Sequence, residues 1–276
     1  LPAIAIAYLG EELSRPAMLS AVASYISASS LGGILGRLLA GFFAELGHWP
    51  WAFWPLFIAS LLLSILVLRY LPRSQHFEAK PFSWRVAAAN NWFHLRQPVL
   101  LTTFLIGGLN FFIYVNQYTY MSFVLAAEPF NLGSGLIGLL FLTYLTGTLG
   151  SALSGRIAQK LPAPIAMALG VVIMMAGSLV TLWQSIPLII LGFFITAFGF
   201  FVTHSLASSW VNRHALKAKA SASALYLVFY YVGASTGSLY LQPFWQWQKW
   251  SGVIVGSCLM LSFTLLLCLS LRRFGR

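Results

Sequence analysis

Long apolar stretches, separated by short polar turns, run through this 276-residue chain from end to end. A helix needs about 20 predominantly apolar residues to cross the hydrocarbon core of a bilayer, so stretches of this length predict transmembrane helices. One polar connection is much longer than the others and lies at residues 72–97. The pattern predicts eight complete transmembrane helices, at residues 19–46, 50–71, 98–126, 133–157, 163–183, 187–211, 219–242 and 248–271.

Residues 20–49 are weakly repeated at residues 221–250, with Tyr25 matching Tyr226 and Gly32 matching Gly233. Counting apolar segments from one copy to the other gives six helices per repeat. Six-helix halves repeated in parallel are one way in which secondary transporters are built. Since the second copy lies in the fifth helix of its half, residues 1–9 would be the end of a fourth helix. We therefore interpret the chain as N-terminally truncated, with about three and a half helices before residue 1.

This numbering of the helices places the boundary between the two halves at the long connection. We expect residues 1–71 to be the remainder of an N-terminal six-helix half, with the end of helix 4 and helices 5 and 6. Residues 72–97 would be the central loop, and residues 98–276 would contain helices 7–12 of the C-terminal half. Basic and aromatic residues are interleaved in the loop, which favours a segment lying on the membrane surface. A flexible linker is the alternative.

The composition is that of a membrane protein. The chain is 59% hydrophobic and 8% charged, and its five acidic residues are all Glu. Soluble domains contain about 25% charged residues, so a water-soluble fold is excluded. We predict an all-α membrane protein.

The net charge of +11 would suit a nucleic-acid ligand, but the positions of the charges argue against one. Alternate connections carry almost all of the Lys and Arg, and on the other side only Lys249 is basic. Such an asymmetry follows the positive-inside rule and places the 72–97 loop and the C-terminus in the cytoplasm. We expect a lipid bilayer as the partner and no nucleic acid.

Arg37 is a charged residue well inside the predicted span 19–46. A charge at this depth is costly and usually marks a functional site, so Arg37 is a candidate for substrate binding or coupling. Its counterpart in the repeat is Ser238, so one half carries the charge and the other does not. The alternative is a structural Arg held by backbone carbonyls or by an acid on another helix. Glu45 lies about 12 Å further along the same helix and is not expected to pair with Arg37.

Glycines recur in several predicted spans, where small residues let helices approach closely. We interpret them as packing residues, with a functional role only where the packed interface moves. They are Gly32, Gly33, Gly36, Gly41, Gly147, Gly155, Gly233 and Gly237.

Polar side chains share a face in three helices of the C-terminal half, judged by helical spacing. A single polar stripe can serve interhelical hydrogen bonding, but three stripes in one half predict a shared water-filled cavity. His204 could carry a proton near neutral pH, although a buried and fully hydrogen-bonded histidine is the alternative. The candidate residues are Asn110, Tyr114 and Gln117 in the first helix, His204 and Ser208 in the second, and Tyr226 and Tyr230 in the third.

Several kinds of chemistry have no motif in the sequence. There is no Walker loop, no GxGxxG and no zinc-spaced set of Cys and His, so we expect no cofactor and no metal. An intramembrane prenyltransferase would need clustered Asp, and the chain has none. A hydrolase would need an activated nucleophile beside its base, which the pair His204 and Ser205 does not establish. We expect no catalytic residues and no enzymatic activity.

Two motifs resemble those of the major facilitator superfamily. Residues Gly155 to Lys160, with Arg156, are similar to the cytoplasmic loop motif G-x-L-a-D-R-x-G-R, which implies a gating role for Gly155, Arg156, Gln159 and Lys160. Gln159 stands in place of the motif's Asp, which puts charge-relay gating in doubt. Residues 32–41 resemble the antiporter motif GxxxGPxxGG of helix 5, with Arg37 in place of its Pro, which weakens the case for antiport.

The chain resembles most closely the bacterial YnfM-like inner-membrane transporters, grouped with arabinose-efflux-type permeases. The similar stretches include residues 1–13, 144–147, 204–210 and 223–233, spread over nearly the whole chain. The resemblance implies the end of helix 4 through helix 12 of a twelve-helix exporter of small organic solutes or drugs. It further implies alternating access with proton exchange, in a multi-pass, monomeric protein of the bacterial inner membrane. A non-transporting membrane remnant or scaffold is the main alternative, and an intramembrane enzyme is a second.

Overall fold

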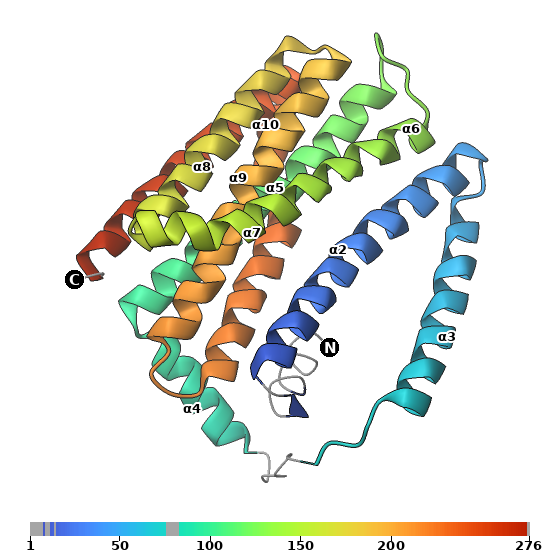
Figure 1. The fold of residues 1–276 in the computed structure, drawn as a ribbon. Helices are drawn as coiled ribbons and strands as arrows, with labels where there is room; N and C mark the ends of the chain where they lie inside the picture. The colour runs from blue at the N-terminus through green and yellow to red at the C-terminus, as the bar shows by residue number, and fades with distance from the viewer. Residues whose placement is uncertain (1–7, 9–11, 14, 76–82, 275–276) are drawn as a thin grey trace. The chain divides into compact units, whose positions relative to one another are not determined.

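The computed structural model describes residues 8, 12–13, 15–75 and 83–274. These residues are almost entirely helical and include no β-strand (Figure 1). The prediction of an all-α membrane protein is therefore confirmed. Most of the predicted partial helix at residues 1–9 lies outside the described residues, and so do residues 76–82 of the predicted central loop.

The chain folds as two compact units, and each is described here by itself. Unit 1 comprises Leu1–Phe82 and Leu125–Leu142, and unit 2 comprises Ser83–Val124 and Thr143–Arg276. The boundaries 1–71, 72–97 and 98–276 remain a prediction. The elements are α2 (Arg15–Glu45), η1 (Trp49–Ala52), α3 (Phe53–Tyr70), α4 (Trp84–Leu95), α5 (Pro98–Ala126), α6 (Ser134–Leu139), η2 (Leu140–Tyr144), α7 (Leu145–Lys160), α8 (Ala163–Val180), η3 (Thr181–Trp183), α9 (Ile186–His214), α10 (Lys219–Ser270) and η4 (Leu271–Phe274).

Six segments of the described chain are long and apolar enough to cross a membrane. The helix α2 covers the predicted span 19–46, and α3 follows it after a short turn. No residue of α3 is buried within the structure, so its apolar surface is available to lipid. The six segments are Trp49–Tyr70, Pro98–Ala126, Ser134–Lys160, Ala163–Trp183, Ile186–His214 and Lys219–Arg273.

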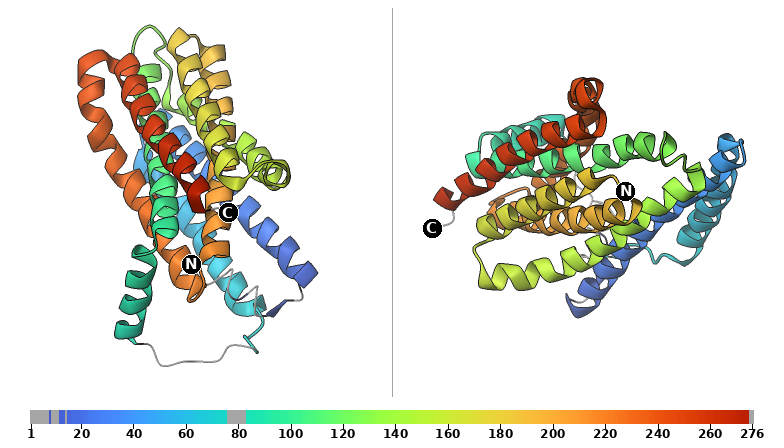
Figure 2. Two further views of the ribbon diagram at one scale, coloured as in Figure 1. Left: turned by 90° about the vertical axis from the view of Figure 1, so that its left-hand side faces the viewer. Right: turned by 90° about the horizontal axis from the view of Figure 1, so that it is seen from above.

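The last of these segments contains two of the predicted spans, 219–242 and 248–271. Its helix α10 has non-helical backbone at Gln248 (φ −142°) and Lys249 (φ 48°), where the chain reverses. The two arms then lie side by side (Figure 2, left), and the hydroxyl of Tyr240 donates a hydrogen bond of 3.2 Å to the carbonyl of Gly256. Because Gly252 has no side chain, it fits against the carbonyl of Phe244 in the opposite arm.

The helices α8 and α9 form the most closely packed pair of unit 2, with α7 and α10 packed beside them (Figure 1). Prolines in the first turn begin both helices, as expected for a residue with a fixed φ and no N–H. Along their contact Gly170 faces Gly199, and Gly177 faces Gly192. The backbone of the neighbouring helix occupies the space that a Cβ atom on each of these glycines would fill. In a membrane, where burial from water does not drive helices together, such backbone proximity provides dispersion contacts instead.

Of the eight glycines interpreted as packing residues, four face close neighbours in other helices. Gly41 lies against the carbonyl of Ser134 in unit 1. In unit 2, Gly147 accommodates the ring of Phe201, Gly233 faces the carbonyl of Gly108, and Gly237 faces Asn116. Among the described residues no atom lies within 4 Å of a Cβ placed on Gly32, Gly36 or Gly155, and Gly33 meets only Arg37 of its own helix.

Gly237 and Gly155 therefore provide a matched test of helix packing. We expect Gly237→Leu to lower the free energy of unfolding by about 1–3 kcal/mol, because overpacking forces α10 away from α5. Gly155→Leu carries the same gain in helix propensity but projects into open space. Thermal unfolding of both purified variants in detergent measures the difference. Equal shifts in the two midpoints would contradict the packing described for Gly237.

Candidate functional site

A group of aromatic side chains from α5, α9 and α10 fills the centre of unit 2. The ring of Tyr114 stacks on Phe200 with centroids 3.9 Å apart, and the ring of Tyr230 stacks on Phe111 at 3.8 Å. His204 lies between these pairs, parallel to Phe200 and 4.8 Å from the ring of Tyr230. We call this group the aromatic cluster; its members are Phe111, Tyr114, Phe200, His204, Tyr226 and Tyr230.

His204 and Tyr226 are joined by a hydrogen bond of 2.9 Å between Nδ1 and the phenol oxygen. The same phenol oxygen lies 3.4 Å from the backbone carbonyl of His204. The phenol can donate to a neutral imidazole, or accept from an imidazolium and donate to the carbonyl instead. Tyr226 is buried and His204 is partly exposed. Gly107 of α5 admits the Tyr226 ring, because any Cβ there would collide with it.

Asn110 places an unused acceptor beside the cluster. Its Nδ2 donates to the carbonyl of Phe200 at 3.2 Å, and the side chain is fully buried. Its Oδ1 has no hydrogen-bond partner among the residues that the structure describes. Leaving a buried acceptor unpaired costs about 1–3 kcal/mol, so this oxygen is suited to a donor from water or from a bound solute.

The structure brings five of the predicted residues together: Asn110, Tyr114, His204, Tyr226 and Tyr230. Gln117 belongs to a different contact, in which its Nε2 donates to Ser178 of α8 at 2.9 Å. Ser208 lies one turn beyond His204, and its carbonyl accepts a bond from Asn212. The shared water-filled cavity remains a prediction. In the structure the ring of Phe200 lies parallel to those of Tyr114 and His204, and the ring of Phe111 stacks on Tyr230.

Arg37 lies in unit 1, where its Nη1 donates to the carbonyl of Gly33 at 3.1 Å. Its guanidinium also stands 4.8 Å from the centroid of the Phe141 ring. Contacts of this kind agree with the structural alternative, in which a carbonyl holds the charge. Glu45 has another partner, the backbone N–H of Gly135, which donates to its carboxylate at 2.8 Å.

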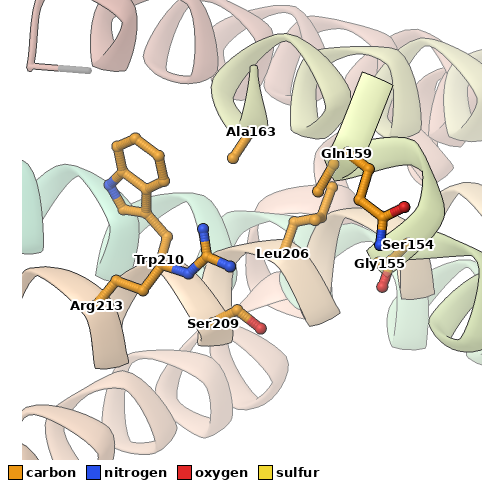
Figure 3. Close-up of a pocket in the computed structure, with 9 residues that line it drawn as sticks. Ser154, Gly155, Gln159, Ala163, Leu206, Ser209, Trp210 and Arg213 are labelled. Atoms are coloured by element: carbon orange, nitrogen blue, oxygen red, sulfur yellow. The ribbon is translucent and has the colours of Figure 1, made fainter. Parts of the chain in front are cut away.

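The turn predicted as a gating loop lies at the end of α7. Gly155 and Gln159 line a cavity of about 270 Å³ together with residues of α8 and α9 (Figure 3). Arg156 and Lys160 are exposed and do not line it. The other lining residues are Ser154, Ala158, Ala163, Leu206, Ser209, Trp210 and Arg213.

Sequence reasoning missed Phe111 and Phe200, which hold the cluster together. Each lies in a long apolar stretch, where an aromatic residue carries no signal beyond hydrophobicity. Tyr118 and Thr143 were also missed, although their hydroxyls are hydrogen-bonded at 2.7 Å within unit 2. Both are polar residues inside predicted spans, and this signal could have identified them.

The model of the Major Facilitator Superfamily matches residues 1–238. The chain belongs to the Major Facilitator Superfamily. It is 35% identical over 269 residues to a protein of Bacillus subtilis named uncharacterized MFS-type transporter YybF, covering 98% of this chain and 66% of that protein. It is 33% identical over 271 residues to inner membrane transport protein YnfM of Escherichia coli, covering 98% of this chain and 65% of that one.

A protein of Buchnera aphidicola named uncharacterized transporter is similar at 35% identity over 271 residues, with 98% of this chain and 66% of that protein covered. The chain thus spans about two thirds of the length of these curated relatives. The resemblance to the major facilitator superfamily and to YnfM-like proteins is confirmed. The protein is a multi-pass membrane protein of a transporter family.

The contact of Glu45 with α6 yields a local prediction. We expect Glu45→Ala to speed amide hydrogen exchange at residues 133–139 several-fold, because the carboxylate no longer accepts from the first turn of the helix. Hydrogen exchange followed by mass spectrometry measures this. Glu12→Ala is the control, since the Glu12 carboxylate accepts from Gln75 instead. Unchanged exchange in Glu45→Ala would show that the contact does not hold α6.

Proposed function

We propose that the protein is a secondary active transporter that exports small organic solutes across a bacterial inner membrane, by alternating access with proton exchange. The family supports transport, and the names of the relatives support both transport and, for YnfM, the inner membrane. The observation that carries the proposal is the aromatic cluster, in which three helices hold a titratable His204 and the free acceptor of Asn110. Transporters of this class place such groups where their helices meet inside the bilayer.

The charge inventory of unit 2 points to a class of solute. All five acidic residues, at positions 11, 12, 45, 78 and 128, belong to unit 1. A cationic solute beside the cluster would find no carboxylate in unit 2 to neutralise it. Aromatic faces stack on flat apolar solutes, and Asn110 Oδ1 offers one acceptor to a hydroxyl or amine. We therefore propose solutes that are aromatic or amphipathic and either neutral or anionic.

His204 is the proposed proton carrier of unit 2. Its hydrogen bond to Tyr226 accommodates the neutral and the protonated imidazole through rotation of one hydroxyl. Because unit 2 contains no Asp or Glu, a histidine is the side chain of this unit best suited to exchange a proton. Arg37 and the turn at Gly155, Arg156, Gln159 and Lys160 are proposed as sites of coupling and gating.

The remaining expectations also belong to this proposal. Lys and Arg in alternate connections support a cytoplasmic C-terminus. We propose a monomer without a cofactor and without enzymatic activity. In the described part of the chain no group of three or more His, Cys, Asp or Glu could hold a metal ion.

Proton coupling is tested by replacing His204. In proteoliposomes containing the full native protein, we expect His204→Gln to abolish solute movement driven by a pH gradient. Exchange of labelled for unlabelled solute at equal pH should persist, since it requires no net proton transfer. Aromatic and amphipathic neutral or anionic dyes are the first solutes to test.

His214→Gln is the matched control, because His214 lies on the same helix, stacks on Trp210 and is outside the cluster. We expect this variant to retain gradient-driven flux. Full gradient-driven flux in His204→Gln would contradict the proton role. Absence of flux from the native protein with every solute would favour the non-transporting scaffold.

The proposed helices before residue 1 are tested independently of flux. We expect the coding frame upstream of Leu1 to encode three further spans, and the intact mass of the native protein to include them. A native chain that begins at Leu1 would contradict the truncated interpretation and also favour the scaffold.

A further inference from the structure

The cavity at the end of α7 and α9 combines a basic side chain with an absence of acids. Arg213 and Gln159 line it, and no acidic residue occurs anywhere in the sequence of unit 2. The eleven basic residues of this unit therefore have no side-chain carboxylate of their own unit to pair with. They are Arg85, Arg96, Arg156, Lys160, Arg213, Lys217, Lys219, Lys249, Arg272, Arg273 and Arg276.

The lining of the cavity offers hydrogen-bond donors. Figure 3 shows the guanidinium of Arg213 extending between Trp210 and Leu206, with the amide of Gln159 on the other side of the space. Ser209 adds a hydroxyl to the lining. Trp210 is only 8% exposed and lines the cavity with its ring, whose indole nitrogen lies on the side away from Leu206 and Gln159 (Figure 3). A guanidinium with neutral donors beside it, here the Gln159 amide and the Ser209 hydroxyl, suits a phosphate group.

The cavity lies near the ends of membrane spans. Arg213 is one residue before the end of the span Ile186–His214, and Gln159 is one residue before the end of Ser134–Lys160. At a rise of about 1.5 Å per residue, both residues lie within about one turn of the span ends. This is the depth at which phospholipid phosphates meet the protein, and basic pockets between helices bind such head groups.

We propose that this cavity, which we call the α7–α9 cavity, binds the phosphodiester of an anionic phospholipid such as phosphatidylglycerol through Arg213. Its volume of about 270 Å³ leaves room for the glycerol of the head group beside the phosphate. A zwitterionic head group is disfavoured, because no carboxylate of unit 2 is present to hold its ammonium. Free inorganic phosphate shares the recognised chemistry and is the other source of the ligand.

Gln159 is central to this proposal. A carboxylate at this position would supply Arg213 with a counterion inside the cavity and would repel phosphate. An amide of nearly the same shape leaves the guanidinium charge available and adds a donor. The substitution Gln159→Glu therefore changes the charge of the cavity with little change in its shape.

The test is native mass spectrometry of the full chain in a neutral detergent, titrated with phosphatidylglycerol, phosphatidylethanolamine or phosphatidylcholine. We expect phosphatidylglycerol to bind best and Arg213→Gln to weaken it at least fivefold. Gln159→Glu should weaken it similarly, and Ala158→Phe should do so by filling the cavity without changing a charge. Arg272→Gln, which removes an exposed cation outside the cavity, is the control and should retain binding.

Unfolding midpoints measured without lipid show whether each variant is folded. Binding that is lost equally in Arg272→Gln and Arg213→Gln would overturn the proposal in favour of diffuse surface charge. Full binding in Arg213→Gln or in Ala158→Phe would overturn it as well. Displacement of the lipid from the native chain by millimolar inorganic phosphate would support the phosphate site and identify the free ion as its ligand. Resistance to phosphate would identify the lipid.

Discussion

The organisation of unit 2 depends on the backbone contact between α8 and α9. Inside a bilayer the apolar side chains of a helix gain nothing by leaving lipid for protein, so association requires a close fit. Gly170 against Gly199, and Gly177 against Gly192, provide that fit. With these two helices fixed, α9 presents Phe200 and His204 to α5 and α10 at defined angles, and the hydrogen bonds of Asn110 and Tyr226 become possible. The glycines thus position the polar groups without contacting them.

The class of fold could be predicted from the sequence because apolar length alone identifies membrane helices. The spans 219–242 and 248–271 were separated correctly, since Gln246 to Lys249 form a polar interruption where the chain reverses. Four of the proposed packing glycines face close neighbours, whereas Gly32, Gly36 and Gly155 do not. The spacing of glycines shows that one face of a helix consists of small residues, but it does not show which neighbouring helix packs against that face. For the same reason Gly170 and Gly199, which are 29 positions apart, gave no local signal.

The candidate site shows a similar division. Helical spacing placed Asn110, Tyr114 and Gln117 on one face, but Gln117 turned out to contact α8 through Ser178. A polar face about two turns long can meet two neighbouring helices, and only packing decides which. Phe111 and Phe200 were invisible in the sequence, because stacking is a property of pairs and each ring stands among apolar residues. Polarity is therefore a guide to the hydrogen-bonding groups of such a site, and a poor guide to what fills the space between them.

The helix α9 carries His204 near its middle and Arg213 near its end, nine residues and about 13 Å apart along a single axis. The backbone contacts of α9 with α8, at Gly192 and Gly199, lie on the side of His204 away from Arg213. A tilt of α9 as a rigid helix would therefore move the proposed lipid site and the imidazole together, without rearranging the side chains between them.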